Sequence, residues 1–219
     1  MDAKEIRFRL VQKLSNVREQ CELAVRGKHR RQPRWWSQWD PALTCDNNLR
    51  NAIEQGDSPR AAERLTAYLT ERNSAQFFWP LADRSAIVTA FTSYFPQRAE
   101  KIVQEAEALC AHRFRIFAYP EIACGLRIPW RRDLIHGIES GLRHYSRYPV
   151  LVMDKVGDTK IVWELNRHQH FSTLCLAHLL TGEEKFAEEC LAQWEDWMEQ
   201  NPYLRGINWA STLEVAFRC

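Results

Sequence analysis

Glycine and proline are scarce in this chain of 219 residues, which contains only eight glycines and nine prolines. A protein built from many strands needs more of both, because they supply the backbone conformations of tight turns. Apolar residues make up 45% of the chain and charged residues 26%, which excludes a disordered or collagenous protein. Nine tryptophans beside so few glycines indicate a helical core with large anchors or a surface that stacks flat ligands. The length fits one domain or two small ones.

An excess of one charge is lacking as well. Thirty Lys and Arg stand against twenty-eight Asp and Glu, giving a formal net charge of +2, so no overall field recruits nucleic acid or anionic lipid. No stretch approaches the ~20 apolar residues of a membrane span, and the N-terminus has no apolar core of a secretory signal. We therefore expect no membrane span. The chain as written is expected in the cytoplasm; a periplasmic location would follow if its start were misassigned.

Several signatures of cofactor and metal sites are missing. The seven cysteines are odd in number and contain no C-x-x-C pair, which predicts free thiols rather than a disulfide framework or a zinc ribbon. The motifs G-x-G-x-x-G, G-x-x-x-x-G-K-[ST] and G-x-S-x-G are also absent, so no motif supports a Rossmann site, a P-loop or a serine hydrolase. His168 and His170 are two residues apart and would leave a helix on nearly opposite sides. We expect neither a metal nor a cofactor.

Helical periodicity runs through most of the chain. An apolar stripe from Ile6 to Ala24 predicts a surface helix that Gly27 can end. Ser58 is expected to cap a second helix with Pro59 at its first position. The further predicted helices cover 83–96, 97–111, 161–182, 186–200 and a last one from about Trp209 to the chain end. The stretch 114–156 is interrupted by prolines and is expected as loop or short strand. The fold class is therefore mainly α, and 161–182 with 186–200 form an antiparallel hairpin.

Two predicted helices carry polar faces. In the first, Glu164 pairs with Arg167 by a spacing of three, and Asn166 pairs with His170 by a spacing of four. A solvated, salt-bridged helix face is the alternative interpretation.

In the last helix, the polar residues recur at steps of three, three and four, beside the large side chain of Trp209. They are Asn208, Ser211, Glu214 and Arg218. Such a stripe faces either water or a ligand. The alternative is an Asn208 cap with an exposed Glu214–Arg218 pair and no function.

A basic and aromatic loop covers 28–39 and contains Trp35, Trp36 and Trp39. Such a loop can bind single-stranded nucleic acid by charge and stacking. No recognised nucleic-acid module accompanies it, so we expect no nucleic acid partner. The tryptophans are expected to anchor the loop or to stack on sugar rings.

Several motifs follow one another in a distinctive order: Phe114-Arg115-Ile116-Phe117, Ile128-x-Trp130-x-x-Asp133, Asp158 to Gln169, Thr181 to Ala187, and Trp197 to Arg218. This order resembles the N-terminal domain of the heparinase II/III-like polysaccharide lyases. The resemblance covers roughly 75–218. Residues 1–74, with the N-terminal helices and the Trp-rich loop, match only loosely as the start of the same domain, and 75–219 are its main segment.

The resemblance implies an incomplete α/α toroid of antiparallel helix hairpins whose inner face grips an acidic polysaccharide or oligosaccharide. Members of the family cleave uronate-containing chains by β-elimination, in which the substrate carboxylate is neutralised, a base takes the C5 proton and an acid protonates the departing O4. The residues that it implies for substrate binding are Trp163, Glu164, Asn166, Arg167, His170, Asn208, Trp209, Glu214 and Arg218.

The sequence departs from the family at its C-terminal end. The catalytic Asn and Tyr motifs of the family lie beyond the segment that matches 208–218, and this chain ends before either. The resemblance therefore implies a truncated product or gene fragment without lyase activity of its own, and no residue is assigned as base or acid. A non-catalytic helical-repeat interaction module is the alternative function.

Overall fold

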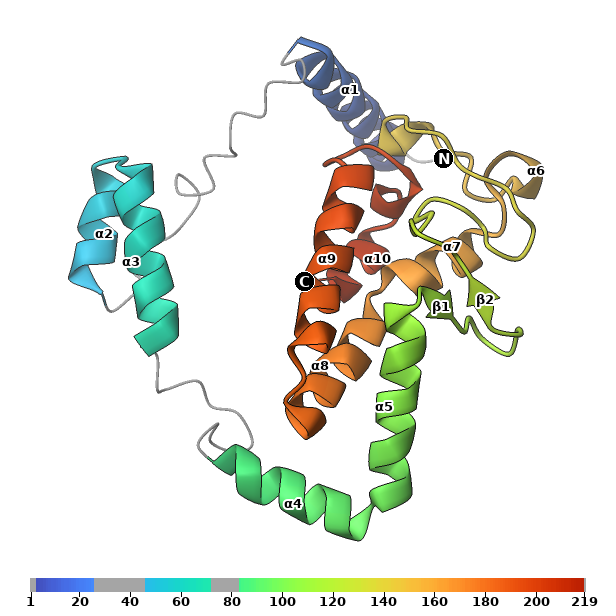
Figure 1. Cartoon of the computed structure of the whole chain (residues 1–219). Coiled ribbons are helices and arrows are strands. Elements are labelled where there is room, and N and C mark those ends of the chain that lie inside the picture. The colour runs from blue at the N-terminus through green and yellow to red at the C-terminus, as the bar shows by residue number, and fades with distance from the viewer. Residues whose placement is uncertain (1–2, 26–45, 72–82, 219) are drawn as a thin grey trace. The chain divides into compact units, whose positions relative to one another are not determined.

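The computed structural model describes residues 3–25, 46–71 and 83–218 (Figure 1). The Trp-rich loop at 28–39 lies outside the described residues. The chain divides into two compact units, Met1–Pro80 (unit 1) and Leu81–Cys219 (unit 2). The sequence-based division into a start of the domain at 1–74 and a main segment at 75–219 stays a prediction.

Unit 1 contains three described helices. The predicted stripe helix is confirmed as α1 (Ala3–Val25). The helix α2 (Asn47–Glu54) was not predicted; it begins where the carboxylate of Asp46 accepts the backbone N–H groups of Asn48 at 2.7 Å and Leu49 at 3.2 Å. Leu49 and Ala52 pack against Ala61 of α3 (Ser58–Glu71).

The cap of α3 differs from the prediction. Ser58 is already inside the helix, and the side chain of Asp57 accepts the N–H of Arg60 at 3.2 Å. Asp57 therefore takes the capping role that the sequence assigned to Ser58, because an Asp side chain caps as well as a Ser side chain and stands one residue earlier.

Unit 2 carries the remaining elements. They are α4 (Arg84–Tyr94), α5 (Pro96–Cys110), β1 (Arg113–Phe114), β2 (Ile122–Ala123), η4 (Tyr145–Arg147), α6 (Met153–Val156), α7 (Thr159–Asn166), α8 (Gln169–Thr181), α9 (Glu184–Gln200), η5 (Ile207–Trp209) and α10 (Thr212–Phe217). The strands β1 and β2 form one short antiparallel pair. The structure confirms the mainly α class, the irregular stretch at 114–156 and the α8–α9 hairpin, whose turn begins at Gly182 with a left-handed φ of 75°.

Two predicted helices are broken in the structure. The expected helix 161–182 is divided into α7 and α8, because His168 takes a left-handed φ of 58° that a continuous α-helix excludes. The expected last helix from Trp209 is a short 3-10 turn, η5, followed by α10. Ser211 between them is extended, with φ −126° and ψ 125°, so the predicted polar stripe does not lie on one helix.

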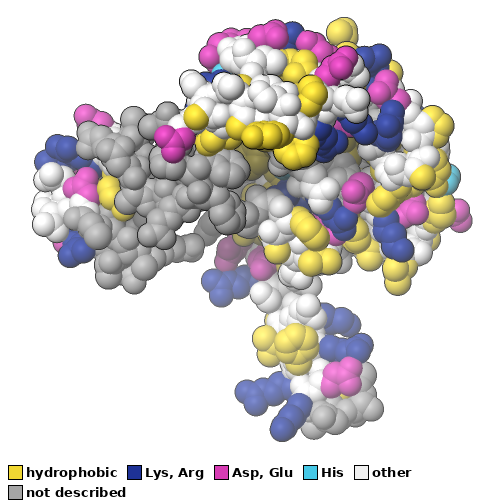
Figure 2. Space-filling view, turned by 90° about the horizontal axis from the view of Figure 1, so that it is seen from below, with side chains coloured by type: hydrophobic (Ala, Val, Ile, Leu, Met, Phe, Trp, Pro, Cys, Tyr) yellow, Lys and Arg dark blue, Asp and Glu magenta, His cyan; other side chains and the backbone are white. Residues whose placement is uncertain are grey.

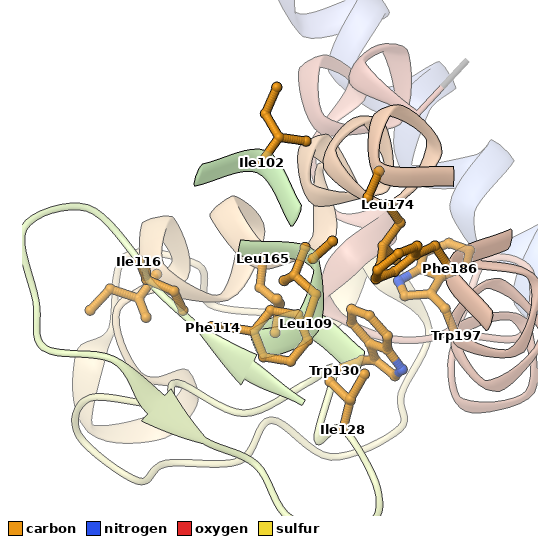
Figure 3. Close-up of a cluster of buried hydrophobic side chains, with 13 residues drawn as sticks. Ile102, Leu109, Phe114, Ile116, Ile128, Trp130, Leu165, Leu174, Phe186 and Trp197 are labelled. Atoms are coloured by element: carbon orange, nitrogen blue, oxygen red, sulfur yellow. The ribbon is translucent and has the colours of Figure 1, made fainter. Parts of the chain in front are cut away.

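The core of unit 2 lies where α5, α8 and α9 pack side by side (Figures 1 and 3). Leu174 of α8 and Phe186 of α9 are fully buried within it. Trp130 and Trp197 join the same cluster (Figure 3). These two tryptophans confirm the expectation of large aromatic anchors in a helical core.

Asp133 fixes the start of α7. Its fully buried carboxylate accepts the backbone N–H groups of Ile135 at 2.9 Å, His136 at 3.0 Å and Asp158 at 2.7 Å. Burial alone would raise the pKa of Asp133, but hydrogen bonds from His136, Asp158 and Ile135 outweigh it and lower the pKa. Asp158 in turn caps α7 through the N–H of Lys160. One buried carboxylate thus positions the helix that carries Trp163, Glu164 and Asn166.

Gly157 provides a test of this arrangement. It has φ 75°, and a Cβ there would lie 2.5 Å from the Cβ of Asp133. We expect Gly157→Ala to lower the free energy of unfolding by about 2–4 kcal/mol, from backbone strain and overpacking together. The matched control is Gly125→Ala, which has φ 74° and no neighbour within 4 Å, and which should cost only about 1 kcal/mol. Urea unfolding measures both free energies, and equal losses in Gly157→Ala and Gly125→Ala would contradict the close approach of Gly157 to Asp133.

Candidate functional site

The side-chain amide of Asn166, the last residue of α7, is buried and makes four hydrogen bonds. Its Nδ2 donates to the carbonyl oxygens of Val162 and Trp130, both at 2.7 Å. Its Oδ1 accepts the indole N–H of Trp197 at 2.7 Å and the Nδ2 of Asn208 at 2.8 Å. These bonds use the full capacity of the amide and join α7, the segment at Trp130, α9 and η5.

Asn208 extends this amide network. It is fully buried, and its Nδ2 also lies 2.8 Å from Oδ1 of Asn201 and 3.2 Å from the carbonyl oxygen of Trp130. The backbone carbonyl of Asn201 accepts the indole N–H of Trp209 at 3.2 Å. Among the described residues, Oδ1 of Asn208 has no hydrogen-bond partner. The sequence indicated Asn201 only as part of the motif from Trp197 to Arg218, since spacing alone does not signal a bond between distant segments.

Arg167 links α7 to α10. Its Nε and Nη2 donate to the two carboxylate oxygens of Glu214 at 2.9 and 2.8 Å, and its Nη1 donates to Glu164 at 2.7 Å. Glu214 is only 2% exposed, whereas the Arg167 side chain is 24% exposed. The hydrogen bond to Glu214 raises the pKa of Arg167 above its usual value. The predicted Glu164–Arg167 pair is confirmed, and the structure adds Glu214 as the buried partner.

Three further candidates lie partly exposed beside this network. The guanidinium carbon of Arg218 lies 5.2 Å from the ring centroid of Trp197 and 5.7 Å from that of Trp209. Arg218 also donates to the backbone carbonyl oxygens of Asn166 and Asn208. Trp163 donates its indole N–H to the carbonyl oxygen of Ile207 at 3.2 Å.

The two histidines are enclosed by aromatic rings. His170 bonds through Nε2 to Oε1 of Gln193 at 3.0 Å, and burial lowers its pKa to about 4. The ring of His168 lies 4.7 Å from that of Phe171 and 4.9 Å from that of Trp197, and neither of its nitrogens has a partner among the described residues. Burial, with smaller contributions from His170 and Arg218, lowers the pKa of His168 to about 3. Both rings are therefore neutral at pH 7.

The structure thus brings the nine predicted residues together, but they differ in how far their side chains are exposed to solvent. Asn166, Asn208 and Glu214 are buried and bonded within the protein. The others are partly exposed around them: Trp163, Glu164, Arg167, His170, Trp209 and Arg218. We call this set the α7–α10 cluster. No three His, Cys, Asp or Glu side chains are grouped to hold a metal ion within the described ranges.

Unit 2 also has an open hollow of about 500 Å³. It is lined by Arg127, Ile128, Pro129, Arg131, Glu139, Leu142, Glu199 and Gln200, and none of the nine predicted residues is among them. Acidic and basic side chains are interspersed on the face seen in Figure 2, in keeping with the net charge of +2. None of the helices that the structure describes has the length and apolar content to cross a membrane.

The Arg167–Glu214 pair generates a stability prediction. Arg167→Ala would leave the Glu214 carboxylate buried without its cation, so we expect a loss of about 3–5 kcal/mol in the free energy of unfolding. The double change Arg167→Met with Glu214→Leu removes both charges and should recover most of that loss. Urea unfolding of the three proteins measures this, and a near-neutral effect of Arg167→Ala would contradict the buried pair.

His168 generates a prediction about pH. Its folded pKa of about 3 lies below the ordinary value, so the unfolded chain binds more protons between the two values. Stability is therefore full above the unfolded pKa of ~6.5 and falls as the pH is lowered toward the folded value. We expect His168 to contribute about 2 kcal/mol of lost stability between pH 7 and pH 5.

The matched variant is His168→Asn, because Asn tolerates the left-handed backbone and does not titrate. His170 would still contribute its own loss in this variant. Unfolding free energies at pH 7 and pH 5 should differ by about 2 kcal/mol less in His168→Asn than in the parent chain. Equal pH dependence of the two proteins would refute the assignment.

Comparison with known proteins identifies the family. The model of the heparinase II/III N-terminus family matches residues 39–219. A heparin-sulfate lyase of Pedobacter heparinus is 25% identical over 157 residues, covering 70% of this chain and 20% of the relative. A heparin-sulfate lyase of Bacteroides stercoris is 36% identical over 50 residues, covering 23% of this chain and 8% of the relative.

Among solved structures, the crystal structure of heparan sulfate lyase HepC from Pedobacter heparinus matches with a TM-score of 0.45 and 19% identity, covering 84% of this chain and 24% of that chain. The chain thus spans about a fifth or less of the length of the curated relatives it matches. The family match extends over far more than half of the residues, and the chain belongs to the heparinase II/III N-terminus family.

Proposed function

We propose that this chain supplies part of the sugar-binding wall of a protein that cleaves acidic, uronate-containing polysaccharide by β-elimination. The observation that carries the proposal is the α7–α10 cluster, in which arginine, carboxylate, amide and indole groups converge from three elements of a family member. Both curated relatives described above are named heparin-sulfate lyases.

The proposal divides the cluster by exposure. Arg167, Arg218 and Trp209 are partly exposed and act on the ligand. A guanidinium binds a carboxylate or sulfate with two parallel hydrogen bonds, and an indole ring stacks on the apolar face of a sugar. The buried residues Asn166 and Asn208 position these groups from behind.

The α7–α10 cluster binds the polysaccharide without cleaving it. β-Elimination needs a base near C5 and an acid near O4 of the substrate. His170 of the cluster and the neighbouring His168 are poor candidates for either task, because burial lowers their pKa values to about 4 and about 3. The proton-transfer groups are then contributed from outside the α7–α10 cluster.

One observation favours the alternative of a helical-repeat interaction module. Asn166, Asn208 and Glu214 already have bonding partners inside the protein, and none of them lines the hollow of about 500 Å³. A module of that kind would show no affinity for oligosaccharides, which separates the two functions by experiment.

The test measures binding of a uronate-rich, sulfated oligosaccharide by calorimetry, with a neutral oligosaccharide of equal length as reference. We expect binding of the acidic ligand only. Arg218→Gln should weaken it by roughly tenfold or more, since a charge-assisted hydrogen bond contributes about 1.5–3 kcal/mol.

The matched control is Arg113→Gln, which removes a half-exposed arginine of β1 that pairs with Glu121. It should leave the affinity unchanged. No release of unsaturated uronate products is expected from the unaltered chain. Absence of binding by a folded chain, or equal effects of the two arginine changes, would refute the proposal.

A further inference from the structure

The α8–α9 hairpin has a defined antiparallel register. His168 before α8 contacts Trp197 of α9 with ring centroids 4.9 Å apart, and Phe171 contacts Trp194 at 6.0 Å. The members of each pair are equally far from the turn at Gly182 and Glu183. The helices therefore face one another so that a residue before the turn meets its mirror position after it.

Two cysteines occupy such mirror positions. Cys175 stands seven residues before Gly182, and Cys190 stands seven residues after Glu183. Both thiols are free; Cys175 is exposed and Cys190 is half-buried. Burial, followed by the charge and hydrogen-bond interaction with Cys175, raises the pKa of Cys190 to about 12. The register and this interaction agree that the two sulfur atoms are neighbours.

We propose that Cys175 and Cys190 form a modification site at which a low-molecular-weight disulfide, such as oxidised glutathione, closes a cross-link between α8 and α9. The Cys175 thiolate attacks one sulfur of oxidised glutathione, which releases one glutathione thiolate and leaves a mixed disulfide. Cys190 then loses its proton to solvent and attacks the sulfur of Cys175, releasing the second glutathione. The two protein thiols are oxidised and one glutathione disulfide is reduced to two thiols.

The order of the steps follows from exposure. Cys175 meets the reagent first because it is exposed. Cys190 is half-buried and therefore reacts with the sulfur of Cys175, which lies beside it, rather than with the reagent in solution.

The cross-link would act on the support of the α7–α10 cluster. Gln193 and Trp197 lie on α9, one and two turns beyond Cys190, and they bond His170 and Asn166. A disulfide between α8 and α9 lowers the conformational entropy of the unfolded chain. It therefore stabilises the folded hairpin in which these bonds form. The inference does not depend on the proposed function.

The test incubates the purified chain with mixtures of reduced and oxidised glutathione, blocks remaining thiols, and digests it with trypsin without reduction. Cleavage after Arg167, Lys185 and Arg205 places Cys175 and Cys190 in separate peptides that each contain one cysteine. We expect mass spectrometry to find these two peptides joined, and the thermal unfolding midpoint to rise on oxidation.

Two variants complete the test. Cys190→Ser should abolish the joined peptides, retain glutathione on Cys175 and lose the rise in the unfolding midpoint. Cys21→Ser, at an exposed cysteine of α1 in unit 1, should behave as the parent chain. Glutathione on Cys175 of the parent chain without any joined peptides, or joining of Cys175 to another cysteine, would overturn the proposal.

Discussion

The buried side-chain amide of Asn166 is the interaction on which unit 2 depends. A buried amide that lacks partners costs about 1–3 kcal/mol for each unsatisfied group, yet this one satisfies two donors and two acceptors at once. No apolar side chain could do this, and a carboxylate could not donate to the carbonyl oxygens of Val162 and Trp130. The amide therefore fixes the relative positions of α7, α9 and η5 more narrowly than apolar packing alone.

The break at His168 gives this network its shape. Because the chain turns left-handed there, α8 leaves in a new direction while Arg167 stays beside α10 and pairs with Glu214. The rings of Phe171 and Trp197 pack against the ring of His168 at the break between α7 and α8. The buried bonds thus hold the partly exposed indole and guanidinium groups in place, as the proposed sugar-binding wall requires.

Much of the fold could be predicted from the sequence, because apolar spacing marks α1, α5 and α9 and the Thr181-Gly182 pair marks the end of α8. The break at His168 could not, since only a few per cent of residues other than glycine take a positive φ and the helical periodicity continues across this position. The helix α2 was missed because it is short and its stripe spans only two turns.

The family resemblance and the helical spacing of polar residues indicated the candidate residues, but not the reason for their proximity. The spacing predicted Asn208, Glu214 and Arg218 on one continuous helix, whereas they meet across the extended Ser211. The partners Trp197 and Asn201 belong to the motif from Trp197 to Arg218, but their bonds to Asn166 and Asn208 were not predicted, because a bond between distant segments leaves no local pattern. Burial of Asn166 and Asn208 was equally invisible, since polar residues are most often exposed.

The carbonyl oxygen of Trp130 also bears on the order in which the molecule folds. It accepts bonds from Asn166 and Asn208, which stand 36 and 78 positions later in the chain. Joining such distant positions costs loop-closure entropy that the local pairing of α8 with α9 largely avoids. Loop-closure entropy therefore favours assembly of the helical hairpin before the two asparagines bond to the carbonyl oxygen of Trp130.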